Sequence, residues 1–325
     1  MHQSNLLRAS GAAAVLAVLA VGCGGPAQQP LTNYERTLVR ITATPNDELL
    51  PQVSPDGSKL LYTSKRVDLH TGIDNYDVWY TNVQTGAPPV LVTTHVADDI
   101  YPTWTPDGEN IVFTTNHDGL PHLWSRSASG VGGSLSLMRG GSVDIQADVS
   151  KDGTKICYAS TQFGVTKQVG QQGGKNGPYA LADEEEVPFI WVMNRDGSEL
   201  TQLVEGLDPA FSPDGERIAF SSMLGGTYDV WVINTDGSHL VQISSDEADE
   251  IEPTWSPDGK FLSFSSNLSG NWDIWVIGSD GTTPVQMTTN TGDDSSPTWS
   301  VDNFIYFQSD RSGNYDVWRL TPPAF

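Results

Sequence analysis

The sequence predicts an all-β protein: a six-bladed β-propeller built from four-stranded antiparallel blades. A short motif, clearest as Trp255-Ser-Pro-Asp-Gly259, occurs six times, and its copies end at Gly57, Gly108, Gly153, Gly215, Gly259 and Asn303. Successive copies lie 51, 45, 62, 44 and 44 residues apart. Strand-rich repeats of about 40–45 residues are typical of propeller blades. The 32 Gly and 20 Pro also suit an all-β chain with many turns.

The fifth repeat shows how one blade is read from the sequence. We expect strands over residues 253–256, 260–266, 272–277 and 284–288. The Ser-Pro-Asp-Gly stretch between the first two suits a tight turn, because Pro presets φ and Gly accepts a positive φ. The third strand carries a Trp in every repeat, which we interpret as packing between neighbouring blades: Trp79, Trp124, Trp191, Trp231, Trp275 and Trp318. In four repeats an Asp stands two residues earlier, and we expect it to form hydrogen bonds at the strand edge: Asp77, Asp229, Asp273 and Asp316.

The sixth repeat lacks an outer strand, and a segment near the N-terminus can supply it. Leu38-Val-Arg-Ile-Thr42 has the same pattern as Leu240-Val-Gln-Ile-Ser244, the expected outer strand of the fourth repeat. Pairing this segment with the last blade would remove two unpaired sheet edges and close the ring. We therefore predict one propeller domain over residues 38–325.

Residues 1–22 are predicted to be a lipoprotein signal peptide. Arg8 precedes an apolar run over residues 9–21 that is too short to span a bilayer. Small residues follow up to Cys23, and Leu19-Ala-Val-Gly22-Cys23 resembles the lipobox of bacterial lipoproteins. This resemblance implies that Cys23 is lipidated, that residues 23–37 form a tether, and that the protein faces the periplasm from the outer membrane. The alternative is an ordinary signal peptide followed by a chance Cys.

The net charge of −23 bears on the choice of partner. So acidic a surface repels phosphate backbones, which argues against nucleic acid as a partner. Cationic partners or metal ions are its natural complement, although solubility alone also accounts for the acidity.

Ten acidic residues fall nine or ten positions before the end of the motif, where we expect loops around one rim of the tunnel. They are Asp47, Glu48, Asp98, Asp99, Asp144, Glu205, Asp249, Glu250, Asp293 and Asp294. We hypothesise that this rim binds a cationic segment of a protein or a calcium ion, because crowded carboxylates raise one another's pKa until a cation relieves them. The alternative is that acids in solvated loops form Asx turns. Insertions at residues 65–75 and 161–188 lengthen loops on the same face, and the longer one is interpreted as a flap.

Four histidines of the first two repeats map to that face as well: His70, His95, His117 and His122. Imidazoles can ligate a transition metal, so a metal site is one hypothesis. Unrelated surface histidines are the alternative.

Tandem Trp-Ser-Pro-Asp-Gly motifs, each followed by a stretch such as Asp273-Ile-Trp275, are similar to the WD-type propeller of the TolB family. The resemblance covers residues 38–320 and implies a periplasmic or envelope protein as partner. TolB carries a separate α/β domain before its propeller. Only about 15 residues separate Cys23 from the first expected strand, so we expect that domain to be absent here.

The chain shows no Gly-x-Ser-x-Gly elbow, His-Glu-x-x-His motif or phosphate-binding loop. We therefore predict a non-catalytic, monomeric binding scaffold without a cofactor, calcium excepted. Two alternatives stay open: a metal-dependent polysaccharide lyase or hydrolase with its site at the tunnel mouth, and a module that senses sugars or peptides.

Overall fold

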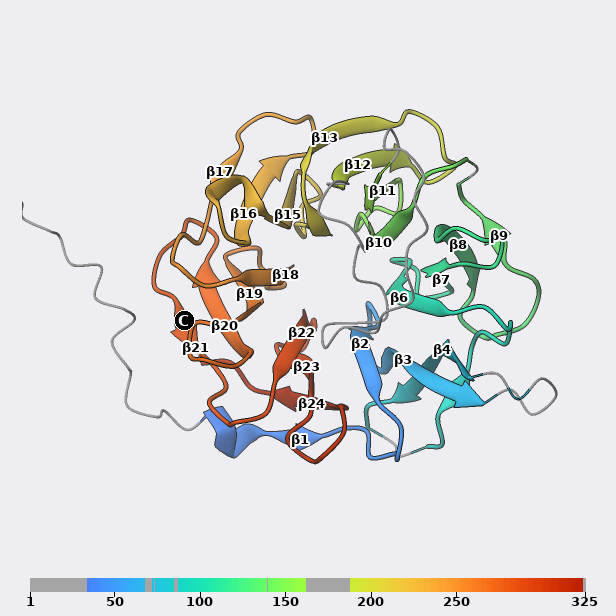
Figure 1. Ribbon diagram of the computed structural model, residues 1–325, viewed down its shortest axis with the longest axis horizontal. Helices are drawn as coiled ribbons and strands as arrows, with labels where there is room; N and C mark the ends of the chain where they lie inside the picture. The colour runs from blue at the N-terminus through green and yellow to red at the C-terminus, as the bar shows by residue number, and fades with distance from the viewer. Residues whose placement is uncertain are drawn as a thin grey trace, which may run out of the picture.

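Six four-stranded antiparallel sheets are arranged in a ring in a computed structural model of the protein (Figure 1). The structure describes residues 34–67, 72, 74–84, 87–138, 140–161 and 188–323. Each sheet is one blade, with its first strand innermost and its last strand at the outer edge. The prediction of a six-bladed propeller is confirmed.

The blades follow one another in sequence order around the ring. Blade 1 consists of β2 (Glu48–Val53), β3 (Lys59–Val67), β4 (Asp74–Asn82) and β5 (Val90–Leu91). Blade 2 consists of β6 (Asp99–Trp104), β7 (Asn110–Thr115), β8 (His122–Ser127) and β9 (Leu135–Ser136). Blade 3 consists of β10 (Asp144–Val149), β11 (Lys155–Ser160), β12 (Phe189–Asn194) and β13 (Thr201–Glu205).

Blade 4 consists of β14 (Leu207–Phe211), β15 (Arg217–Ser222), β16 (Asp229–Asn234) and β17 (Val241–Gln242), with the 3-10 helix η2 (Met223–Gly225) between the second and third strands. Blade 5 consists of β18 (Glu250–Trp255), β19 (Phe261–Ser266), β20 (Asp273–Gly278) and β21 (Val285–Gln286). Blade 6 consists of β22 (Asp294–Trp299), β23 (Ile305–Ser309) and β24 (Asp316–Leu320).

The fourth strand of blade 6 comes from the N-terminal segment, as predicted. Strand β1 (Val39–Arg40) follows the 3-10 helix η1 (Tyr34–Thr37) and pairs antiparallel with β24, with Arg40 opposite Trp318. The guanidinium of Arg40 also lies 2.6 Å from a carboxylate oxygen of Asp316. Backbone pairing and this ion pair together hold the ring closed.

The Ser-Pro-Asp-Gly turns are held by the side chains that the motif supplies. In the fifth repeat the Ser256 hydroxyl donates to Asp258 Oδ1 at 2.7 Å and accepts the N–H of Phe261 at 3.0 Å. Gly259 has a φ of +70°. Asn303 takes the same left-handed conformation, with a φ of 62°, which Asn tolerates better than most residues.

Apolar side chains between adjacent blades form the core. Trp255 of blade 5, for example, packs in one cluster with Val232 of blade 4 and with Leu262 and Trp275 of its own blade. Trp191 and Trp275 of the third-strand series are buried, and the other four are half-buried against such clusters. Their predicted role in packing is confirmed.

Part of the first insertion is strand and not loop. Strands β3 and β4 stay paired from Lys65 opposite Tyr76 to Val67 opposite Asp74, which lengthens the hairpin. Residues 162–187 of the second insertion lie outside the described residues, as do the proposed signal peptide, Cys23 and the tether up to residue 33. Among the residues that are described, no helix has the length and apolar character needed to cross a membrane.

Candidate functional site

The acids nine positions before the motif end are the first residues of the innermost strands. Five of them are at most 2 % exposed: Glu48, Asp99, Asp144, Glu250 and Asp294. The expectation that these acids lie in loops is therefore wrong. The cause is that each innermost strand begins earlier than expected, at Glu250 and not at Pro253 in blade 5.

Each of these buried acids faces the third strand of the preceding blade. In four junctions the neighbour is another buried acid, so that Glu48 meets Asp316, Asp99 meets Asp77, Glu250 meets Asp229 and Asp294 meets Asp273. Burial, and then repulsion from these neighbours, raises the pKa of Glu48 and of Asp99 to about 7. In the remaining case Asp144 accepts a hydrogen bond from His122 Nδ1 at 2.9 Å.

The acids ten positions before the motif end fasten neighbouring blades together. Asp47 Oδ1 accepts the backbone N–H of Tyr315 at 3.0 Å, while the N–H of Glu48 donates back to the Tyr315 carbonyl at 2.8 Å. Asp98, Asp249 and Asp293 accept backbone N–H groups in the same way, from Tyr76, Tyr228 and Trp272. Glu205 is half-buried at the end of β13. Most of the proposed acidic rim thus has a structural role, and its binding of a cation or a partner stays a prediction.

The structure brings together two of the four histidines. The rings of His95 and His117 are exposed and lie 3.8 Å apart between centroids, whereas His122 is buried against Asp144. His70 falls outside the described residues. Within the described part of the chain, no three His, Cys, Asp or Glu side chains are placed to hold a metal ion. The metal site stays a prediction.

A central tunnel lies between the innermost strands, and a β-bulge in each of these strands shapes it. The bulged residues are left-handed, with φ between 49° and 57°: Leu50, Tyr101, Gln146, Asp208, Glu252 and Ser296. None is glycine, and each such residue costs on the order of 1 kcal/mol of backbone strain. A bulge re-aims a side chain. Here all six residues line the tunnel.

The tunnel has a volume of about 370 Å³ and extends from these bulges to the Ser-Pro-Asp-Gly turns. Its mouth on that turn face is ringed by Pro55, Pro106, Lys151, Pro213, Pro257 and Val301. Five rigid or apolar residues and one lysine therefore frame the entrance. The mouth lies on the face opposite the loops that the sequence pattern favoured.

Two carboxylates lie together in the inner part of the tunnel. Glu252 accepts hydrogen bonds from the Ser296 hydroxyl at 2.8 Å and from the Ser265 hydroxyl at 3.0 Å. Asp208 accepts one from Ser221 at 2.9 Å. Burial raises the pKa of both carboxyls, and the charge of Glu252 raises that of Asp208 further. The pair therefore retains a proton more readily than two separate acids would.

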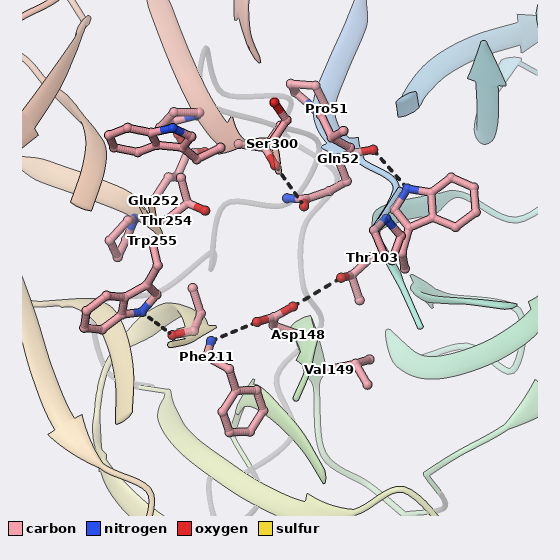
Figure 2. Close-up of a pocket in the computed structure, with 18 of the residues that line it drawn as sticks. Pro51, Gln52, Thr103, Asp148, Val149, Phe211, Glu252, Thr254, Trp255 and Ser300 are labelled. Carbon is pink, nitrogen blue, oxygen red and sulfur yellow. Dashed lines mark hydrogen bonds between the residues drawn. The ribbon is translucent and has the colours of Figure 1, made fainter. Parts of the chain in front are cut away.

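A third carboxylate, Asp148, also lines the tunnel, at a repeat position two residues closer to the motif end than Asp208 and Glu252 (Figure 2). It accepts the backbone N–H of Phe211 at 2.8 Å and the hydroxyl of Thr103 at 3.3 Å, so residues of three blades fix its position. Burial raises the pKa of Asp148 to about 6, against the lowering effect of these hydrogen bonds. In its ionised form the carboxylate can attract a cationic group that enters from the mouth.

Sequence reasoning missed Asp148, Asp208 and Glu252. The signal was present at two repeat positions, five and seven residues before the motif end. The first of these reads Gln52, Thr103, Asp148, Ala210, Thr254 and Thr298, so a single carboxylate stands out among uncharged side chains. What the pattern did not show is that a bulge turns both positions toward the tunnel.

Comparison with known proteins finds matches to other β-propellers. The family model described as TolB beta propeller domain matches residues 185–281 and 207–322. TolB from Acinetobacter baumannii is similar in structure, with a TM-score of 0.62 and 16% identity, over 82% of this chain and 64% of that one. Oligogalacturonate lyase from Vibrio parahaemolyticus has a TM-score of 0.56 and 14% identity, over 88% of this chain and 93% of that one.

One curated relative matches in sequence, the uncharacterized peptidase YuxL of Bacillus subtilis. It is 25% identical over 205 residues, which make up 55% of this chain and 30% of the relative. The chain therefore spans less than a third of that protein's length. At these identities the solved structures show only that the fold is shared. The similar proteins are named for different roles, among them a lyase and a peptidase.

Proposed function

We propose that this propeller is a protein-binding scaffold of the cell envelope, a proposal supported by the match of residues 185–281 and 207–322 to the TolB beta propeller domain model. In this proposal the partner inserts a positively charged segment into the tunnel from the turn face. The location rests on the lipobox-like stretch before Cys23. The binding mode rests on one observation, which is that the Asp148 carboxyl is held by hydrogen bonds from two neighbouring blades inside an open tunnel.

The geometry of the tunnel suits an extended peptide or a long side chain. The mouth, with its four prolines, is already rigid, so binding there orders few protein groups and costs little conformational entropy. Behind it, Asp148 meets the entering charge first, and Asp208 and Glu252 lie deeper. A cation close to the second pair would favour its ionised form and lower the raised pKa values.

The loop face contributes less in this proposal. The carboxylates of Glu48, Asp99 and Glu250 are buried between blades, and that of Asp47 is engaged with the Tyr315 N–H. Breaking those contacts to bind a partner would cost the stability of the blade junctions. A partner that binds at the tunnel mouth leaves them intact.

Photo-crosslinking in the native envelope tests the proposal. A photoreactive residue at Thr254, in the tunnel wall, should capture a partner protein, and one at Val241, on the outer edge, should not. The captured partner, once purified, should bind Asp148→Asn about tenfold more weakly, a loss of about 1.4 kcal/mol. Asn keeps the size of the side chain and one oxygen acceptor for the Phe211 N–H, and its amide group can donate to the Thr103 hydroxyl in place of accepting from it.

Binding to the unaltered protein should also weaken as salt is added. Capture from exposed loop-face positions such as Asp118 but not from Thr254, together with unchanged binding by Asp148→Asn, would contradict the tunnel as the binding site.

A further inference from the structure

A second cavity lies between blades 2 and 3, outside the tunnel. Its volume is about 190 Å³. Val112 and Leu137 of blade 2 form one wall, and Val149 and Ile156 of blade 3 form the other. Leu135, 66 % exposed, and Arg195, whose side chain is 43 % exposed, stand on its open side. The cavity is therefore largely apolar with a cationic group at its edge.

The repeat explains why a cavity exists at this junction. Four positions before the motif end, blades 2, 5 and 6 carry Trp104, Trp255 and Trp299, and each indole packs against the preceding blade. Blade 3 has Val149 at that position. The volume that an indole occupies in three sister junctions is therefore left unfilled here.

The wall formed by blade 2 also carries a smaller side chain than the equivalent walls of other blades. Ser125 pairs with Val112 in the β-sheet register, and the equivalent residues in blades 1, 4 and 5 are the larger Tyr80, Val232 and Val276. Small side chains thus meet from both blades. This makes the cavity a local departure from the repeat on two strands at once.

The closing junction shows how the same loss of Trp can be compensated. Val53 of blade 1 also replaces the Trp, but Phe304 of blade 6 packs against the cluster at that junction. The residue of blade 2 equivalent to Phe304 is the polar Asn110, which lines the cavity. Among the described residues that line this cavity, no such aromatic residue takes the place of the indole.

Arg195 supplies a second recognition element. Its guanidinium lies 4.0 Å from Asp107, and both side chains are 43 % exposed, so this ion pair contributes little. The guanidinium can turn to a carboxylate on a bound molecule, a geometry that arginine favours. An apolar cavity of about 150 Å³ is known to stay dry and to bind benzene, so this one can take a single planar ring system.

We propose that the cavity between blades 2 and 3 binds small planar aromatic carboxylates. The ring lies between Val149 and Val112 in the place of the sister indoles, and the carboxylate pairs with Arg195.

Binding of indole-3-acetate to the full-length protein, measured by calorimetry, tests this. The ligand should bind the unaltered protein, and Val149→Trp should abolish binding by filling the cavity with the side chain that sister blades carry. Ser125→Tyr fills the cavity from the wall opposite Val149 with the residue type of the equivalent Tyr80 of blade 1. This second variant should also abolish binding, and it serves as the test if Val149→Trp folds poorly. Val241→Trp adds an indole at an outer strand away from the cavity and should bind as the unaltered protein does.

The role of Arg195 is tested separately. Arg195→Gln should weaken indole-3-acetate binding about threefold to fivefold, the effect of a partly exposed ion pair, and leave binding of neutral 3-methylindole unchanged. The proposal is overturned if indole-3-acetate does not bind, or if Val149→Trp and Ser125→Tyr both fold and bind it unchanged. Equal affinity for hexanoate, which has no ring, would also overturn it.

Discussion

Asp99→Asn should stabilise the propeller at neutral and alkaline pH. Asp99 is 2 % exposed, and burial, followed by repulsion from Asp77 and Asp98, raises its pKa from 3.8 to about 7. A carboxyl with a raised folded-state pKa contributes its full stabilisation below the unfolded pKa, and this contribution is lost as pH rises through the folded pKa. Each pKa unit corresponds to about 1.4 kcal/mol, so the full loss between about pH 4 and pH 8 reaches about 4 kcal/mol. Asn does not ionise, so the variant does not lose this stability as pH rises.

Urea unfolding of both proteins at about pH 5 and pH 8 measures the effect. The variant should gain on the unaltered protein as pH rises. Asp107→Asn is the matched control, since it removes the same charge from an exposed turn. There hydrogen bonds from Thr105 and Glu109 lower the pKa of Asp107, so its stabilising contribution is present at neutral pH and lost on acidification. Asp107→Asn should therefore lose stability at pH 8. An Asp99→Asn protein less stable than the unaltered one at pH 8 would refute the reasoning, because ionised Asp99 would then be favourable, as with a bound cation.

Substitutions of Trp255 and Arg40 probe how the ring is held. Trp255→Ala should cost about 3–5 kcal/mol of unfolding free energy by opening the junction of blades 4 and 5. Trp255→Phe should cost less, because it loses mainly the hydrogen bond from Nε1–H to the Ala210 carbonyl at 3.0 Å. Equal losses in the two variants would mean that this hydrogen bond, and not packing, stabilises the junction. Arg40→Ala should cost about 1–2 kcal/mol, because it leaves the fully buried Asp316 without its guanidinium while Arg40 itself is 35 % exposed. Lys260→Ala, from an ion pair in which Lys260 is 74 % exposed, should change little, and a similar loss in both variants would contradict a special role for the closing pair.

The repeat pattern was sufficient for the ring and its closure. Motif copies such as the one ending at Gly259 predicted both the number of blades and the tight turns, because those turns depend on local side chains. Pairing of β1 with β24 followed from counting strands in the last repeat. These features depend on local chemistry and on the order of elements, and both are readable along the chain.

The candidate site was less predictable because it depends on contacts between blades. The sequence shows that Glu48 and Asp316 are acidic. It does not show that these two residues, 268 positions apart in the chain, are buried together at one blade junction. The bulge at Glu252 could not be predicted from the sequence, because its left-handed residue is not the glycine that usually indicates such a conformation. The cavity beside Val149 becomes visible only once one knows which strand each wall belongs to.

The bulged residues have a consequence for how such a ring can change over evolutionary time. Six different amino acids, from Leu50 to Ser296, adopt one backbone conformation there, so this conformation does not depend on which side chain it carries. Strand pairing on either side fixes it. Mutation can therefore exchange apolar, aromatic, amide and acidic groups at the axis while the surrounding sheets stay as they are. After gene duplication, a few codon changes at these positions could give one copy of the propeller a new ligand.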